Sequence, residues 1–192
     1  MKTESLLTQT KRILRRFDLK SRKRLGQHFL VDEEVLQLIA ASAELDPSDT
    51  IVEIGPGLGI LTGELARRAG LVIAVELDDK LAASLTKTLA SFSNINIINQ
   101  DILRLDPAAL LPAPGPYKVV ANLPYYITSP VLRHFLEATV KPKRMVVMVQ
   151  KEVAEAITAG PGQRSMISLS VQFYGKPKIV SYVPARAFYP AP

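Results

Sequence analysis

The chain has 192 residues, with 24 Lys plus Arg against 18 Asp plus Glu, which fits one soluble globular domain. It contains no Cys and two His, which excludes a disulfide scaffold and a cysteine-ligated metal site, and we expect no metal. No apolar run approaches the roughly 20 residues of a membrane span, and the polar start lacks a secretory signal, so we expect a cytoplasmic protein with no membrane attachment.

The first 24 residues form a basic segment. They carry nine basic and two acidic residues, against six and thirteen in 25–132 and nine and three in 133–192. This asymmetry suggests that the two ends hold a polyanion around a neutral or cationic small ligand in the acidic middle. A solvated tail is the alternative. We favour nucleic-acid contact because residues 11–24 carry eight basic groups and one acid.

Alternating strands and helices follow. Asp32 is placed to cap a helix. Apolar runs predict strands at 50–54, 71–77, 94–99, 117–122 and 144–149. Helices are predicted at 59–69, at 79–90, from Pro130 with Ser129 as its cap, and at 151–159, and 107–116 reads as a Pro-rich surface loop. Such alternation indicates a mostly parallel sheet covered on both faces, with ligands beyond the carboxyl ends of its strands. Residues 168–175 and 178–184 predict an antiparallel edge hairpin, which completes seven strands.

A glycine-rich turn joins the first of these strands to a helix. Residues 53–59 read EIGPGLG, and glycine permits tight turns and close backbone approach to a ligand. The dinucleotide spacing requires glycine where Ile60 stands, and a phosphate-binding loop ending in Gly-Lys-Ser/Thr has no counterpart. An NAD enzyme therefore fails on spacing.

Carboxylates follow the next two strands. Glu76 lies 21 residues after Gly55, where a carboxylate can accept from both hydroxyls of a ribose. Asp101 is placed to accept from an adenine amino group. Because the acidic middle suits a sulfonium cation better than a pyrophosphate, we predict S-adenosylmethionine as the ligand. The alternative for both residues is a carboxylate that caps the next turn.

The segment Asn122-Leu123-Pro124-Tyr125 ends the fourth strand. An exocyclic amino group of a nucleobase is a poor nucleophile because its lone pair is delocalised into the ring. The Asn122 side-chain carbonyl and the Leu123 backbone carbonyl can accept its two N–H groups and turn the lone pair toward a methyl donor. Pro124 stiffens the turn, and Tyr125 offers a face for base stacking. A turn with an Asn cap is the alternative.

Over residues 13–190 the chain resembles the small-subunit ribosomal RNA adenine dimethyltransferases, the KsgA/RsmA family. The matching stretches are 22–30 (RKRLGQHFL), 53–62 (EIGPGLGILT), Glu76, Gln100-Asp101, 122–125, 149–154 (VQKEVA) and 169–171 (LSV). Leu123 and the GQHFL stretch favour this family over the related Erm enzymes, which modify large-subunit RNA.

The resemblance implies an α/β fold of the Rossmann-like class I S-adenosylmethionine-dependent methyltransferases, with an RNA-contacting segment at 1–24 and a catalytic domain at 25–192. It implies two methyl transfers to N6 of each of two adjacent adenosines near the 3′ end of small-subunit (16S) rRNA in a pre-ribosomal particle. We expect a monomer. Family members continue beyond Pro192 into a small helical domain, so we expect a truncated form that docks more weakly. Ala156 and Met166-Ile167 depart from the family and predict altered RNA contact at 160–167.

The resemblance and the charge distribution together imply three groups of site residues. The S-adenosylmethionine site would comprise Gln27, His28, Leu30, Gly55, Gly57, Glu76, Leu77, Asp101, Ile102 and Asn122. The target adenine would be held by Asn122, Leu123, Pro124, Tyr125 and a second aromatic, Phe188. RNA phosphates would contact Arg12, Arg15, Arg16, Arg22, Lys23, Arg24, Lys141, Lys143 and Arg144. Phe188 could instead belong to the core and His28 could be a packed side chain. We assign His28 no proton transfer.

Positioning can supply roughly 7 to 11 kcal/mol for an in-line methyl transfer, which needs no metal. No strong base accompanies Asn122, so we expect water to remove the proton, and the target base must leave its stack. Two other functions stay open: an adenine methyltransferase acting on large-subunit rRNA or DNA, and an RNA-binding assembly factor whose methylation is dispensable or lost. The intact 122–125 segment argues against lost activity.

Overall fold

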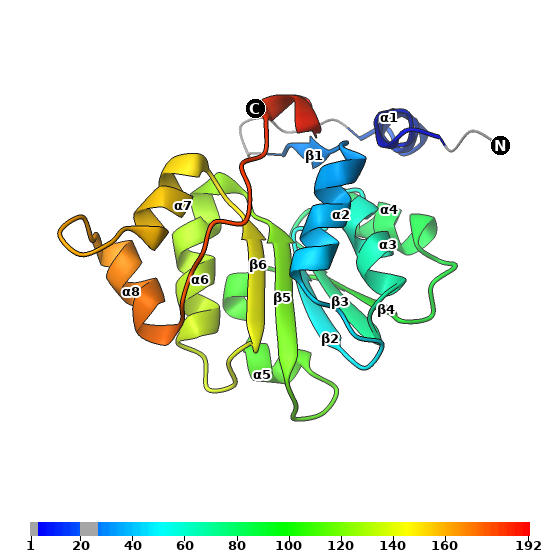
Figure 1. The fold of residues 1–192 in the computed structure, drawn as a ribbon. Coiled ribbons are helices and arrows are strands. Elements are labelled where there is room, and N and C mark those ends of the chain that lie inside the picture. The colour runs from blue at the N-terminus through cyan, green and yellow to red at the C-terminus, as the bar shows by residue number, and fades with distance from the viewer. Residues whose placement is uncertain (1–3, 20–26) are drawn as a thin grey trace.

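A five-stranded parallel sheet forms the centre of the computed structural model, which describes residues 4–19 and 27–192 (Figure 1). Its strand order is β4-β3-β2-β5-β6. The strands are β2 (Thr50–Ile54), β3 (Leu71–Glu76), β4 (Ile95–Asn99), β5 (Tyr117–Asn122) and β6 (Arg144–Met148). From β2 the chain builds outward in one direction through β3 and β4 and in the other through β5 and β6. The point between β2 and β5 is therefore the topological switch point, where such sheets bind ligands.

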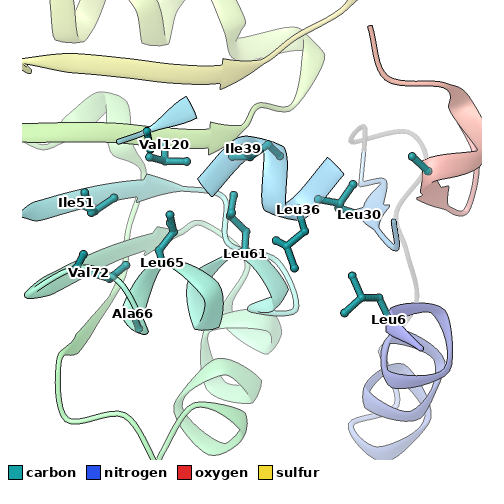
Figure 2. Packing of buried hydrophobic residues seen from close by; sticks show 13 residues of the cluster. Leu6, Leu30, Leu36, Ile39, Ile51, Leu61, Leu65, Ala66, Val72 and Val120 are labelled. Atoms are coloured by element: carbon teal, nitrogen blue, oxygen red, sulfur yellow. The ribbon is translucent and has the colours of Figure 1, made fainter. Parts of the chain in front are cut away.

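Helices cover both faces of the sheet. Alternate residues of the central strands, among them Ile51, Val72 and Val120, pack against α2 (Glu33–Ser42) and α3 (Ile60–Ala66) (Figure 2). Their neighbours in sequence face the other side and pack against α5 (Pro107–Leu110) and α6 (Thr128–Leu136). Helix α4 (Asp79–Thr88) packs against β3 and β4. Burial on both faces explains the near-continuous apolar sequence of these strands.

The two ends of the described chain meet beyond the carboxyl ends of the strands. β1 (Phe29–Leu30) and β7 (Phe188–Tyr189) form a short antiparallel sheet, and α1 (Leu6–Arg16) lies beside it (Figure 1). Leu6 belongs to the same buried cluster as Leu30 (Figure 2). The basic helix is thereby packed onto the α/β domain.

The predicted edge hairpin is wrong, and so is the seven-stranded sheet. Residues Met166–Tyr174 form helix α8, which packs against α6 and α7 (Lys151–Thr158), and residues 178–184 form no strand. The helix begins with a capping box in which Ser165 and Ser168 bond each other's backbone N–H groups. A short apolar run does not distinguish a strand from a helix, and the capping box favours the helix.

Two helix starts also differ from the prediction. Ser129 does not cap α6, because a 3-10 turn at Tyr125–Ile127 (η3) runs directly into that helix and Ile127 occupies the cap position. Pro130 is accommodated because it lies in the first turn, where its missing N–H is not needed. The Pro-rich stretch at 107–116 starts with the single turn of α5, capped by Asp106. Asp32 caps α2 as predicted.

Across residues 4–19 and 27–192, no helix has the length and apolar character needed to cross a membrane.

Candidate active site

A cavity of about 290 Å³ lies at the switch point, beyond the carboxyl ends of the central strands. The turns that follow β2, β3, β4 and β5 line it, together with residues 27–30 around β1. All ten residues predicted for the donor site line this cavity: Gln27, His28, Leu30, Gly55, Gly57, Glu76, Leu77, Asp101, Ile102 and Asn122. The structure thus brings together side chains that lie up to 95 positions apart in the sequence.

The glycine-rich turn after β2 forms the floor of the cavity. Gly55, Gly57 and Gly59 have φ values of 64°, 60° and 80°, which favour glycine. The Gly55 N–H donates to the carbonyl of Val75 at 2.9 Å and so holds the turn against β3. A Cβ at Gly57 would lie 3.2 Å from Cε1 of Phe29. Without side chains at these glycines, a ligand can approach the backbone of the turn closely. A larger residue would be strained at these φ values and, at Gly57, would press on the Phe29 ring.

Two predicted carboxylates stand at the strand ends. Glu76 accepts hydrogen bonds from the N–H of Gly57 at 3.0 Å and from that of Asp78 at 2.9 Å, one on each oxygen. Burial raises the pKa of Glu76, and these two N–H groups oppose the rise. Asp101 accepts from the N–H of Leu103 at 3.0 Å and so caps the following 3-10 turn. The capping alternative therefore holds for one oxygen of Glu76, which accepts from Asp78, and for one oxygen of Asp101, while both residues line the cavity.

A third carboxyl group, Glu53, received no role in the sequence analysis. It lines the cavity but is only 2% exposed. Its Oε2 has no hydrogen-bond partner among the described residues, and neither has the buried Oγ1 of Thr62. Burial raises the pKa of Glu53 to about 8; the nearby Thr62 hydroxyl, although not hydrogen-bonded to Glu53, opposes this rise, and the charge of Glu76 adds to it. The sequence signal for Glu53 was a single carboxylate flanked by apolar Val52 and Ile54 within the strand TIVEI.

Asn122 is held in a defined orientation. Its Nδ2 donates to the backbone carbonyl of His28 at 3.1 Å. Because a carbonyl only accepts, the amide must present Nδ2 to His28, which leaves Oδ1 as the free acceptor. The next residue, Leu123, is 1% exposed and its N–H donates to the carbonyl of Met148 at 3.1 Å. Hydrogen bonds to two neighbouring segments therefore fix the start of the 122–125 segment.

The two aromatic residues predicted to hold the target adenine, Tyr125 and Phe188, lie outside the lining of this cavity. Tyr125 stacks on the ring of His28, with centroids 6.1 Å apart and planes 24° apart, and it does not line the cavity. Tyr126, which the sequence analysis missed, lines the cavity and is 58% exposed. Phe188 pairs with Leu30 across the short sheet and packs against the cluster around it, outside the cavity lining. His28 Nδ1 lies 2.8 Å from the carbonyl of Pro190.

The residues predicted to contact RNA fall into three places. Arg12, Arg15 and Arg16 lie on α1, and Arg12 forms an ion pair with Glu4. Lys141, Lys143 and Arg144 precede or begin β6, at the end of the sheet opposite the cavity. Arg144 is bound there to the Glu44 carboxylate at 2.6 Å and to the Ser42 carbonyl at 3.0 Å. Arg22, Lys23 and Arg24 lie outside the described residues.

Lys151 and Arg186 were not predicted as RNA contacts, although both follow the carboxyl end of β6 in the chain rather than precede the strand. Lys151 begins α7, directly after the carboxyl end of β6, and Arg186 lies just before β7. The sequence analysis grouped the cations by their position along the chain and had no means of assigning them to one end of a strand. In the part of the chain that the structure describes, no three His, Cys, Asp or Glu residues form a group suited to a metal ion.

Comparisons with known proteins show the family of the chain. The family model described as ribosomal RNA adenine dimethylase matches residues 18–192. Ribosomal RNA small subunit methyltransferase A of Dehalococcoides mccartyi is 56% identical over 99% of this chain and 65% of its own length. The protein of that name from Alkaliphilus oremlandii is 43% identical over 96% of this chain and 66% of its own length. The chain thus spans about 65% of the length of these curated relatives.

Solved structures show the same architecture. The 23S rRNA methyltransferase ErmE is 36% identical, with a TM-score of 0.73 over 85% of this chain and 65% of that one. A dimethyladenosine transferase from Plasmodium falciparum is 28% identical, with a TM-score of 0.75 over 86% of this chain and 59% of that one. The fold is that of the class I S-adenosylmethionine-dependent methyltransferases, and the chain belongs to the ribosomal RNA adenine dimethylase family.

Proposed function

We propose that this chain carries the catalytic site of an enzyme that transfers methyl groups from S-adenosylmethionine to N6 of adenine in small-subunit ribosomal RNA. The observation that carries the proposal is the orientation of Asn122, which lines the cavity at the switch point and whose Nδ2 is held by the His28 carbonyl, so that Oδ1 remains as the acceptor atom. The proposal is supported by the relatives named as small-subunit methyltransferases, which match nearly the whole chain.

The cavity suits this methyl donor by its charge. Its described lining residues include the four acids Glu53, Glu76, Asp78 and Asp101 and no Lys or Arg. Such a lining favours a cation and disfavours a pyrophosphate. Glu76 would hold the ribose hydroxyls and Asp101 the adenine amino group, while the open backbone at Gly55 and Gly57 admits close contact. When bound, S-adenosylmethionine supplies an electrophilic methyl group on a positively charged sulfur.

The acceptor side relies on two carbonyl groups. Asn122 Oδ1 and the Leu123 backbone carbonyl would accept the two N–H groups of the target amine, which directs the nitrogen lone pair toward the donor. Neither group removes a proton, so water would take the proton after the nitrogen has become cationic. Tyr125 and Tyr126 would supply the stacking surface for the extruded base, at about 1 to 3 kcal/mol for each stacked base. Phe188 would close the other face of the base.

The proposal also specifies which adenosines are methylated and in which ribosomal particle. We propose two methylations on each of two adjacent adenosines near the 3′ end of the small-subunit rRNA, within a pre-ribosomal particle in the cytoplasm, by a monomer. The exposed arginines of α1, Arg15 and Arg16, support contact with RNA phosphates on the cavity side. The 36% identity with ErmE makes large-subunit RNA the competing substrate to be tested.

The test measures radiolabelled methyl transfer to small-subunit particles that lack the modification, with large-subunit particles assayed in parallel. We expect label in the small-subunit RNA, recovered as dimethyladenosine. Asn122→Ala should abolish incorporation and leave RNA binding unchanged. Asn96→Ala, an exposed position on the edge strand β4, is the matched control and should retain activity. Label confined to large-subunit RNA, or full activity in the Asn122 variant, would contradict the proposal.

A further inference from the structure

The surroundings of Glu53 are unusual for a carboxyl group. In the parallel sheet its register partners are Ala74 on β3 and Val120 on β5, so aliphatic side chains flank it on the same face. Helix α3 covers that face and contributes Thr62, whose hydroxyl is fully buried. Glu53 Oε2 lies in this apolar setting without a hydrogen-bond partner among the described residues. A buried polar atom left in this state needs an explanation.

No positive group in the described part of the cavity compensates Glu53. Glu76 on β3 has both oxygens occupied by backbone N–H groups. The other titratable residues in the described lining are Asp78, Asp101, Tyr126 and His28, and His28 Nδ1 is engaged with the Pro190 carbonyl. Helix α2 adds apolar Leu36 and Ile39 to the cluster on this face. Burial raises the pKa of Glu53 to about 8, so the group is mostly a neutral acid at pH 7.

We propose that Glu53 couples donor binding to the release of one proton, because the cation of the donor stabilises the carboxylate that the empty cavity disfavours. The O–H bond of the Glu53 carboxyl group breaks and its proton passes to the buffer, while no other covalent bond changes. This inference rests on the proposed methyl donor. It assigns Glu53 to the binding step and gives it no part in proton removal from the target amine.

The coupling has a definite sign. The donor-bound protein holds fewer protons than the empty protein, so affinity for the donor rises with pH. The rise approaches tenfold per pH unit between the Glu53 pKa of the donor-bound protein and about pH 8, where only the donor-free protein holds the proton, and it levels off on either side of this range. A cavity acid that is already ionised at neutral pH would give no such dependence.

Isothermal titration calorimetry in buffers of different ionisation enthalpy measures the effect without turnover. At pH 7 we expect close to one proton released for each S-adenosylmethionine bound, falling toward zero above pH 9. Glu53→Gln should bind the donor without proton release. Glu64→Gln is the matched control, since Glu64 lies on α3, is ion-paired with Arg67 and Arg68 and does not line the cavity, so it should retain the release.

Binding of 5′-methylthioadenosine, which shares the adenosine and carries no positive charge, should release no proton. Equal release in wild-type protein and Glu53→Gln, or equal release with both compounds, would overturn the proposal. If Glu53→Gln does not fold, the pH profile of proton release in the wild-type protein decides. Release that does not decline around pH 8 would contradict the proposal. Failure to bind the donor at all counts against the proposed function, whereas binding without release counts only against the role of Glu53.

Discussion

The side-chain amide of Asn122 donates to the backbone carbonyl of His28, 3.1 Å away and 94 positions earlier in the sequence. The same histidine stacks on Tyr125 and approaches the Pro190 carbonyl with its Nδ1. His28 therefore links the 122–125 segment to the last residues of the chain, and its main-chain carbonyl holds Nδ2 of Asn122, so that Oδ1 remains as the acceptor atom of this cavity-lining side chain.

Asn122→Asp should lower the rate of methyl transfer by roughly 10²-fold or more, the scale of losing one positioned polar group in an active site. The aspartate has no N–H for the His28 carbonyl, so the two oxygens repel each other and the side chain turns away. Single-turnover methyl transfer measures the rate, and circular dichroism checks that the fold is intact. A rate within threefold of wild type would show that the His28 contact does not set the orientation.

Gly57→Ala should weaken donor binding and lower the free energy of unfolding by about 1 to 3 kcal/mol, because φ is 60° and the new Cβ would meet the Phe29 ring. Chemical denaturation and calorimetry measure the two effects. Gly160→Ala is the control, since nothing lies within 4 Å of its Cβ position. Similar losses in both variants would argue against a specific requirement at Gly57.

The stability difference between wild-type protein and Glu53→Gln should depend on pH. The pKa of Glu53 is about 8 in the folded protein against a model value of 4.5, so its contribution to stability is fully present below about pH 4.5 and is lost as the pH rises through 8. Between these values wild type should lose about 1.4 kcal/mol per pH unit relative to the glutamine variant. Parallel stability curves for the two proteins would mean that Glu53 is ionised when folded.

Lys118→Met should destabilise the fold by about 3 kcal/mol. Lys118 is 6% exposed in β5, and its Nζ donates to Asp49 at 2.6 Å and to the Glu44 carbonyl at 2.5 Å. Removing the ammonium leaves both oxygens without their cation, at the end of the sheet opposite the cavity. Urea denaturation gives the change, with exposed Lys80→Met as control. A loss below about 0.5 kcal/mol would show that the contact is merely a surface ion pair.

Replacing Arg15 and Arg16 together by Ala should weaken RNA binding and reduce the slope of log affinity against log salt by roughly one to two. Both side chains are exposed on α1, on the cavity side of the sheet. Lys143→Ala, at the opposite end of β6, should change the slope little. The reverse result would place the RNA at the other end of the molecule.

The parallel strands and the donor cavity were predictable from sequence because both depend on local patterns. Apolar runs mark strands that are buried on both faces, and residues that follow parallel strands gather at one edge of the sheet. Helix α8 was missed because its apolar run is short, and Glu53 because its isolation arises from Ala74, Val120 and Thr62, which come from three different elements.

Charge counted along the chain does not show at which end of the sheet a basic residue lies. Counting charge along the chain grouped Lys141, Lys143 and Arg144 with the basic residues of the first segment as RNA contacts, and the structure places them at the amino end of β6, opposite the cavity. Arg144 is bound to Glu44 and Ser42 there. Lys151, only a few residues later, follows the carboxyl end of the same strand. The five residues of β6 are enough to carry the chain from the amino end of the parallel strands to their carboxyl end.

A crystal structure of the protein with S-adenosylmethionine bound tests the central claim most directly. We predict adenosine between Glu76 and Asp101, the sulfonium end of the donor on the Asn122 side of the cavity, and Asn122 Nδ2 still donating to the His28 carbonyl. A donor bound away from residues 122–125, or an Asn122 side chain that presents Nδ2 to the donor, would contradict the account.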